Sequence, residues 1–450
     1  LFFMPRANTA PPADREVFED NPAPHSPGAF APAVNAVAAP VSTSPPSPAS
    51  APASADHQSH DRYLAAFMSL SVLVGTANGI SRVCLPLFAA SLHAAAWQIG
   101  IAGGLQYAGI RLLSIPLAAL IDRHGSRPLF RIGATAAAAV FLLGLTQVRA
   151  PWQLIGCVFL LGLSIPFRIV PTQTEFLHLL PSLGPMKAGW NRGSHTLGMF
   201  FIGPTLGAFL IVALGFAPTF AVVGAGLLLT LLIGSRVLKS APPGRGGDAT
   251  PLRVRMREQF ALMSQRPELR RTMLIDFCGQ MALAYFSVFI VLVGMRSFGM
   301  STQQAAGLIT LQGALFVSTL FAGGVVLARV DEERRYMLAF VLLLAHAALL
   351  SAPPSPAWLW AGALCLGLGL GVQHLTSVNR FGTLMRELGR GKVGGMSSLA
   401  GPAGGLTGAT LGGALSQHFG MMAGFRVLAA VYVLQCLLQR RRLWVVRAAA

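Results

Sequence analysis

Twelve apolar stretches, each about as long as a bilayer is thick, alternate with short connections along this chain of 450 residues. A helix needs roughly 20 apolar residues to cross about 30 Å of hydrocarbon, and lipid offers no partner for an open backbone. Each stretch is therefore predicted to be a transmembrane helix. The spans are expected near residues 63–91, 97–121, 128–148, 152–178, 193–215, 218–239, 272–294, 302–327, 336–351, 357–382, 394–417 and 421–440.

The composition supports a bilayer as the solvent. Hydrophobic residues make up 53% of the chain and charged residues only 11%, so a soluble globule would expose large apolar patches. The formal net charge of +18 would suggest nucleic acid in a soluble protein. Here the charge is concentrated in alternate connections, and no nucleic-acid partner is expected.

Lysine and arginine gather in the connections that follow even-numbered spans. The connection after span two carries Arg123, Arg127 and Arg131, whereas the one after span seven carries only Arg296. Cytoplasmic connections of helical membrane proteins are the basic ones, so both termini are predicted to be cytoplasmic. Short connections and an alanine- and arginine-rich composition lead us to expect the inner membrane of a bacterium.

Short pieces of sequence recur in the second half of the chain at preserved intervals. Leu105-Gln106 recurs as Leu311-Gln312, and Arg123 recurs at the same offset as Arg329. Transporters are often built from duplicated halves. We therefore predict an all-α polytopic membrane protein whose 12 transmembrane helices form two pseudo-symmetric six-helix bundles.

The domain boundaries follow from this repeat. Residues 1–61, built mainly from proline, alanine and serine, are expected to be a disordered cytoplasmic tail. The first bundle is expected at 62–240 and the second at 272–447. Residues 241–271 would then form a cytoplasmic linker.

The connection after span two reads Asp122-Arg123-His124-Gly125-Ser126-Arg127. It resembles the signature loop of the major facilitator superfamily, although Ala118 and Ser126 depart from the family pattern. In that family the loop pairs charges across the two halves and holds one face closed. The resemblance implies this gating role for Asp122, Arg123, Gly125 and Arg127. The alternative is a loop whose charges only set the topology.

Span five carries Gly198, Gly203, Pro204 and Gly207, which resembles an element of the family's proton-coupled exporters. Glycines let helices approach closely, and a proline removes one backbone donor and permits a bend. The alternative is ordinary tight packing between helices. Two glycine pairs and one triplet in other spans also place small residues at helical spacing, where they can form a close-packed seam: Gly75 and Gly79, Gly100 and Gly104, and Gly404, Gly408 and Gly412.

Polar and charged side chains recur inside the predicted spans, where an ionised group is costly unless it lines a cavity or a path. In the resembled family, spans one, four, seven and ten line the central cavity. Residues three or four apart share a helix face, which groups the polar residues into stripes. The candidate cavity residues are Asn78, Arg82, Gln106, Arg111, Arg168, Thr172, Gln280, Gln373, Ser377 and Arg380.

Arginine outnumbers acid inside the spans, and a guanidinium pairs with carboxylate or phosphate. We therefore expect the cargo to be a small organic anion, or a zwitterion with an anionic end. Glu175 and Asp276 are the candidate proton-coupling residues, with His195 as a further possibility. The competing interpretation is that Arg168 pairs with Glu175 as a purely structural contact.

The sequence favours a secondary transporter that works by alternating access, and within that class proton-coupled export. An organic-anion importer or uniporter is the alternative within the fold, and a non-transporting membrane sensor or scaffold is the alternative outside it. No clustered nucleophile and base, metal-ligand set or nucleotide-binding loop is visible. We expect no enzymatic activity, no cofactor, no metal and a monomer whose partners are its cargo, protons and lipid.

Overall fold

The computed structural model describes residues 53–183, 190–238, 261, 263–388 and 390–449. Most of the expected tail and of the expected linker lies outside these residues. The helix that contains span one begins at Ala53, ahead of the predicted edge near residue 63. Alanine has the highest helix propensity, which fits a start at Ala53.

Every predicted span coincides with a helical element in the described part of the chain. The first six spans correspond to α1 (Ala53–Ser91), α2 (Ala96–His124), α3 (Ser126–Ala139) with η1 (Val140–Gly144) and η2 (Leu145–Gln147), α4 (Pro151–Leu183), α5 (Trp190–Leu197) with η4 (Gly198–Ile202) and α6 (Gly203–Leu214), and α7 (Phe216–Val237). The last six correspond to α9 (Pro267–Phe298), α10 (Thr302–Val326), α11 (Glu332–Ser351), α12 (Pro356–Leu388), α13 (Arg390–Phe419) and α14 (Ala423–Ala449).

Among the described residues, nine spans are both long and apolar enough to cross a membrane on their own. The helices α13 and α14 are not among them, and the side chains of α2 are described only in part. α13 is rich in glycine, which contributes little hydropathy, and α14 contains the basic run Arg440–Arg442. These three helices nevertheless pack as full members of the fold.

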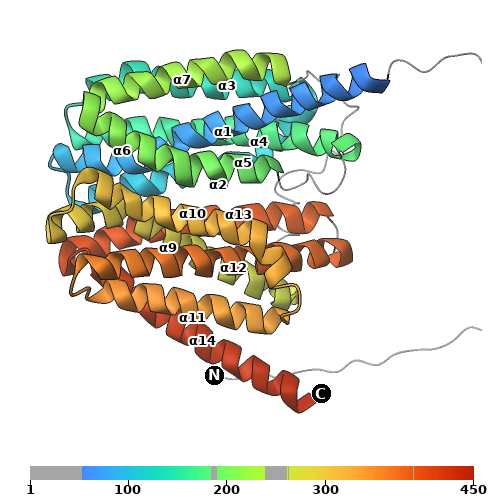
Figure 1. The fold of residues 1–450 in the computed structure, drawn as a ribbon, viewed down its shortest axis with the longest axis vertical. Helices are drawn as coiled ribbons and strands as arrows, with labels where there is room; N and C mark the ends of the chain where they lie inside the picture. The colour runs from blue at the N-terminus through green and yellow to red at the C-terminus, as the bar shows by residue number, and fades with distance from the viewer. Residues whose placement is uncertain (1–52, 184–189, 239–260, 262, 389, 450) are drawn as a thin grey trace, which may run out of the picture. The chain divides into compact units, whose positions relative to one another are not determined.

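The helices form two groups that follow each other in sequence (Figure 1). α1 to α7 lie together, in blue to green, and α9 to α14 lie together, in yellow to red. We call these groups the first and the second bundle. Within the first bundle α4 packs on α2 and α3, and within the second α12 packs on α10 and α11. The two groups have the arrangement expected of a duplicated chain.

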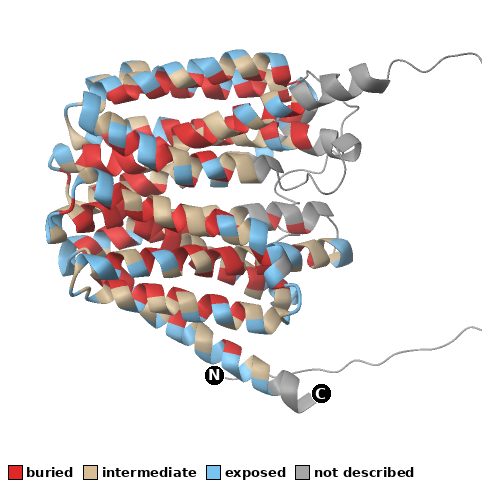
Figure 2. Cartoon of the chain, viewed as in Figure 1, coloured by how far each residue is buried: buried red, intermediate tan, exposed pale blue. Residues whose placement is uncertain are grey.

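Burial is highest along α9. Every residue from Ala282 to Gly294 is buried, and Figure 2 shows the buried positions gathered on the inner faces of the helices. Large apolar side chains such as Leu229 and Leu232 of α7 are exposed instead, as lipid-facing residues must be. α9 therefore forms part of the core where the two bundles meet.

Successive helices run in opposite directions, so the connections collect at two ends. We call the end that holds the α2–α3, α10–α11 and α12–α13 connections the basic end, because it carries Arg123, Arg329 and Arg386. The opposite end holds the α1–α2, α9–α10 and α13–α14 connections, and we call it the far end. The basic end lies to the right in Figure 1.

Glycines set the spacing between helices in both bundles. A Cβ at Gly79 would overlap the backbone of Met199, and one at Gly198 would overlap the backbone of Val72. The glycines predicted to make seams in spans one and five therefore pack against each other. In the second bundle, a Cβ at Gly404 or Gly408 would likewise overlap the backbone of α9. Close backbone approach of this kind is typical of membrane helix pairs.

Candidate functional site

Arg82 lies where the two bundles meet. Its Nη2 donates to Tyr107 Oη of α2 at 3.2 Å, and its Nη1 donates to Ser287 Oγ of α9 at 3.4 Å. The Cζ atom stands 4.9 Å from the ring centroid of Phe200 in η4. One half-buried guanidinium from α1 thus reaches α2, η4 and α9. The hydrogen-bond partners described for it are neutral hydroxyls, so its positive charge is available to an anion.

An aromatic row continues from Arg82 into the second bundle. The ring centroids of Phe200 and Phe316 of α10 are 5.8 Å apart, and those of Phe316 and His374 of α12 are 5.9 Å apart. Phe200 is almost fully buried. Aromatic pairs at these separations add to the stability of a contact. Phe200 therefore links the guanidinium of the first bundle to the rings of the second.

Arg168 lies deeper in the first bundle and is only 2% exposed. Its Nη2 donates to Asn78 Oδ1 of α1 at 3.2 Å, which joins two residues predicted to line the cavity. Among the described residues, its Nε and Nη1 have no hydrogen-bond partner. Thr172 is also buried, but its hydroxyl is used within α4, on the carbonyls of Arg168 and Ile169. Asn78, which holds Arg168, is one turn from Arg82 on α1. The guanidinium groups of Arg82 and Arg168 are therefore neighbouring positive groups.

Two other candidates of the first bundle lie on α2. Gln106 is half-buried beside Gly162 of α4, against which α2 packs closely. Arg111, one turn further toward the basic end, is exposed. Neither residue is brought into the hydrogen-bonded group around Arg82. Tyr107 takes that position, and the sequence gives no signal for it other than an aromatic residue next to Gln106.

The candidates in the second bundle are held between its own helices. Gln373 Nε2 donates to the carbonyl of Ile275 at 2.8 Å, and Ser377 Oγ lies 3.4 Å from Tyr336 Oη of α11. Arg380 Nη2 donates to Glu268 Oε2 at 3.4 Å. The expected stripe of α12 therefore packs on α9 and α11, and Arg380 is ion-paired near the basic end. Gln280 of α9 is half-buried and lies beside Gly401 of α13.

The ion pair of Arg380 belongs to a larger network that the sequence reasoning missed. Arg271 makes two hydrogen bonds to the Glu333 carboxylate, at 2.8 and 2.6 Å, and Gln439 Nε2 donates to the same group at 2.6 Å. Arg442 pairs with Glu268 at 3.1 Å. The network ties α9, α11, α12 and α14 together at the basic end. Its acids, Glu268 and Glu333, lie beside connections, where the sequence pattern of charges predicts topology only.

The acids proposed for proton coupling have different surroundings. Glu175 is buried in α4, two turns from Arg168 toward the basic end. Asp276 is half-buried on α9, where a Cβ at Gly401 would stand 3.2 Å from its Oδ2. His195 is half-buried, and its backbone packs on Gly75 of α1. A proton-coupling role for these three residues stays a prediction.

The connection after α2 has the backbone that its motif requires. Gly125 has φ of +81°, a conformation that residues with a Cβ rarely adopt, and its N–H bonds the Ile121 carbonyl at 2.7 Å. Arg127 is half-buried and Arg123 is exposed. The side chain of Asp122 lies outside the described set. Charge pairing by this loop across the bundles stays a prediction.

Span five departs from α-helical geometry at its glycine and proline motif. Residues Gly198–Ile202 form a π-helix, closed by a bond from the Gly203 N–H to the Gly198 carbonyl. Pro204 follows directly and cannot donate to the carbonyl four residues earlier, that of Phe200. The wider π-turn is a common way to accommodate such a break, and π-turns often occur at functional sites. Here the π-turn presents Phe200 to Arg82.

The bundles meet along two seams. In the first, α2 packs on α13 near the far end, where Gly100 touches Gly413 and the Ala96 N–H donates to Gln417 Oε1 at 3.0 Å. In the second, η4 and α6 pack on α10, where Gly313 touches Phe200. Beyond Tyr107, α2 exposes Leu112 by 61% and Leu120 by 38%. The first seam is therefore closed toward the far end.

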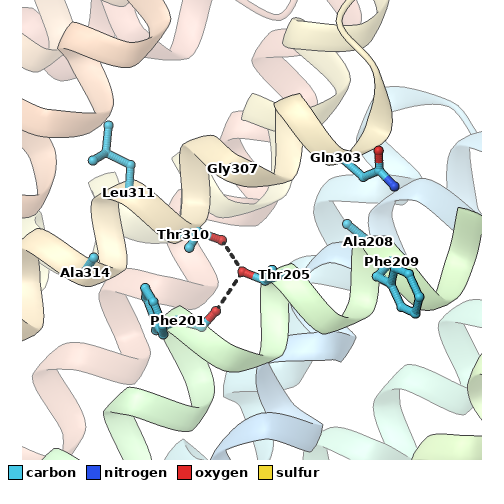
Figure 3. A pocket seen from close by; sticks show the side chains of 9 residues that line it. All are labelled: Phe201, Thr205, Ala208, Phe209, Gln303, Gly307, Thr310, Leu311 and Ala314. Atoms are coloured by element: carbon cyan, nitrogen blue, oxygen red, sulfur yellow. Dashed lines mark hydrogen bonds between the residues drawn. The ribbon is translucent and has the colours of Figure 1, made fainter.

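The second seam also contains a hollow of about 550 Å³, drawn in Figure 3. It opens on the outer side of α6 and α10, where Phe201 and Phe209 are exposed. Arg82 and Arg168 are not among its lining residues. This hollow is therefore distinct from the group around Arg82. Within the described residues, no set of three His, Cys, Asp or Glu side chains could hold a metal ion.

Two comparisons define the class of protein. The family model of the Major Facilitator Superfamily matches residues 67–389, which is most of the chain. The chain belongs to the Major Facilitator Superfamily, as the loop after α2 predicted. Family and fold together indicate an integral membrane transporter that binds a small molecule, and not an enzyme.

Solved structures of transporters share the fold. The crystal structure of the nucleoside transporter NupG matches with a TM-score of 0.69 and 13% identity, over 84% of this chain and 98% of that one. A bacterial homolog of the human lysosomal transporter Spinster, in an inward-facing and unoccupied conformation, matches with a TM-score of 0.63 and 13% identity, over 84% of this chain and 95% of that one. At sequence identities this low, the two comparisons show a shared fold and nothing further. Among curated proteins, no sequence matches this chain at a significant level.

Proposed function

We propose that this protein is a secondary transporter of a small organic anion, or of a zwitterion with an anionic end. The observation that carries the proposal is the half-buried guanidinium of Arg82, which has hydroxyl and aromatic neighbours at the junction of the bundles. A cation inside a membrane protein is costly unless an anion or a cavity compensates it. A carboxylate or phosphate of the cargo would accept the hydrogen bonds that Tyr107 and Ser287 now accept.

Neighbouring groups support an anionic cargo. Arg168 of α4 adds a second guanidinium, which Asn78 of α1 holds one turn from Arg82. Two of the Arg168 nitrogens have no hydrogen-bond partner among the described residues. The buried ring of Phe200 packs beside Arg82 and makes this side of the junction apolar. In our proposal Arg82 binds the anionic group, Tyr107 and Ser287 orient it, and Arg168 strengthens the positive field.

Transport would proceed by rocking of the two bundles around Arg82. The first seam is closed toward the far end, and α2 is exposed toward the basic end. If the basic end is cytoplasmic, as the positive-inside rule predicts, this arrangement would receive cargo from the cytoplasm. Binding that bridges Arg82 and Ser287 would draw α1 and α9 together and favour closure of the basic end.

Proton-coupled export is the direction that we favour. It is supported by the glycine and proline motif of span five, whose π-turn contacts Arg82 through Phe200. Glu175 and Asp276 are the proposed proton carriers, because both are acids within the spans. We place the protein, as a monomer, in a bacterial inner membrane with cytoplasmic termini. Import or uniport of an organic anion is the alternative within the fold.

Everted membrane vesicles with a preformed pH gradient test the proposal. A panel of organic anions, zwitterions, nucleosides and cationic drugs is added, and dissipation of the gradient is measured. We expect an anion or a zwitterion to dissipate it in the native protein, with loss in Arg82→Ala and partial retention in Arg82→Lys. Arg296→Ala, an exposed arginine at the far end of α9, is the matched control and should behave as the native protein does.

The other outcomes separate the alternatives. Uptake of a radiolabelled anion without any proton movement would favour the importer or uniporter. Dissipation by cationic drugs that survives Arg82→Ala would reject an anion site at this residue. Correctly inserted protein that moves none of these compounds in either direction would favour the sensor or scaffold.

A further inference from the structure

The hollow on the outer side of the second seam has walls from both bundles (Figure 3). η4 and α6 supply one wall, which includes Phe201 and Phe209, and α10 supplies the other, which includes Gly307 and Ala314. Its volume of about 550 Å³ is large enough for a sizeable ligand. No residue of the group around Arg82 is needed to form it.

The hollow is continuous with the surface that the protein presents to lipid. Phe201 and Phe209 are 46% and 58% exposed, and Leu206 and Val212 of the same span are exposed as well. The protein spans a membrane, so these large apolar side chains contact hydrocarbon. A ligand that enters the hollow from this side comes from the bilayer.

The two hydroxyl groups inside the hollow, those of Thr205 and Thr310, already have hydrogen-bond partners. Thr310 Oγ1 lies 3.0 Å from Thr205 Oγ1, and either hydroxyl can donate across this contact. The Phe201 carbonyl accepts from Thr205 Oγ1 at 3.0 Å, and the Ala306 carbonyl lies 3.4 Å from Thr310 Oγ1. Both hydroxyl protons have an acceptor whichever one donates across the contact. A polar cargo would find few hydrogen bonds here, whereas a hydrocarbon chain displaces none.

The length and depth of the hollow fit one hydrocarbon chain. Along α10 it runs from Gln303, in the first turn at the far end, to Ala314, about halfway along the helix. Eleven residues at about 1.5 Å each cover about 16 Å, from the membrane interface to the bilayer centre. An extended chain advances about 1.2 Å per bond, so this length holds roughly a dozen carbon atoms.

We propose that an acyl chain of a bilayer phospholipid, from the leaflet at the far end, occupies this hollow. Its head group lies near the exposed amide of Gln303, and its chain passes over the Thr205–Thr310 pair to Ala314. Because α6 and α10 belong to different bundles, the bound chain contacts both. Separation of the second seam during transport then has to release or reshape this lipid contact.

Photo-crosslinking in phosphatidylglycerol nanodiscs tests this inference without a transport assay. One probe is a phosphatidylglycerol with a diazirine near the middle of an acyl chain, and a second carries the diazirine next to the glycerol. We expect the first probe to label the peptides that contain Phe201 and Ala314, and the second to label the peptide that contains Gln303. Labelling is expressed relative to the exposed Leu229 and Leu232 of α7, which face bulk lipid.

A filling variant and a matched control decide the outcome. Ala314→Leu should lower mid-chain labelling of Phe201 at least fivefold, whereas Ala322→Leu, at an exposed alanine of the same helix outside the hollow, should leave it unchanged. Leu311→Phe is the second filling variant if Ala314→Leu does not fold. Equal labelling in the filling variant and the control, or labelling no stronger than at α7, would overturn the inference.

Discussion

The two seams between the bundles are built in different ways. On the first seam the backbones of α2 and α13 meet directly, since a Cβ at Gly100 would overlap both Ala409 and Gly413. On the second seam one close backbone contact, of Gly313 with Phe200, is accompanied by side-chain contacts, with Thr205 bonded to Thr310 and Phe200 packed on Phe316. A backbone contact is either made or lost, whereas side chains can rotate and repack. The first seam is therefore expected to tolerate less change than the second.

The largest effect is expected at the first seam. Gly100→Leu places a side chain where the backbones of α2 and α13 touch, and overpacking of this kind costs about 1–3 kcal/mol. Closure of the far end should become roughly tenfold to a hundredfold less favourable. We expect transport to fall by a similar factor. The measurement is cargo flux, together with labelling of a cysteine placed at Ala96.

Gly156→Leu is the matched control for that variant. Gly156 lies on α4, and a Cβ there meets nothing within 4 Å. This substitution should leave flux unchanged and stabilise the helix slightly, because leucine has the higher helix propensity. An equal loss of cargo flux in Gly100→Leu and Gly156→Leu would mean that the flexibility of glycine, and not close contact at the seam, explains the effect.

An intermediate effect is expected at Phe200. Phe200→Leu keeps most of the apolar volume but removes the ring faces that contact Arg82 and Phe316. Cation–π and aromatic contacts are each worth about 0.5–1.5 kcal/mol, so KM for the cargo should rise about tenfold. Phe159→Leu, at an exposed phenylalanine of α4, is the control. An unchanged KM in Phe200→Leu would remove the ring from the site.

The smallest effect is expected from Thr310→Val. The valine keeps the shape of the side chain and removes one hydrogen bond across the second seam, worth about 0.5–1.5 kcal/mol at most. Melting in detergent should shift by only about 2 °C. The double variant Thr205→Val, Thr310→Val should melt close to the single one. If the decreases in melting temperature caused by the two single substitutions added up fully in the double variant, the two hydroxyls would not act as a pair.

The sequence predicted the helices better than it predicted which residues contact each other. Hydropathy located each span, because lipid permits only closed helical backbone there. Spacing identified Gly79 and Gly203 as seam residues, and the structure pairs them with each other. No rule based on one chain could reveal that pairing, because it depends on which helices become neighbours.

Prediction of the candidate functional site from the sequence has the same limit. Asn78, Arg82 and Arg168 were identified because charge inside a span is costly, and the structure joins Asn78 to Arg168. Arg380 has the same sequence signal but pairs with Glu268, an acid at the start of α9. Tyr107 and Ser287 gave no signal, since isolated hydroxyls are common in membrane helices. Sequence spacing gives the helix face of a residue, and only the fold shows what that face meets.

The glycine-rich composition of α13 has a consequence for biogenesis. α13 is not among the spans that are apolar enough to cross a membrane on their own. Its main neighbours, α2 across the first seam and α9 in the second bundle, are both synthesised before it. The glycines that lower the hydropathy of α13 also fit it closely against these two helices, as Gly413 does on Gly100 and Gly404 does on Phe277. Insertion of α13 is thus a late step that depends on the earlier assembly of α2 and α9.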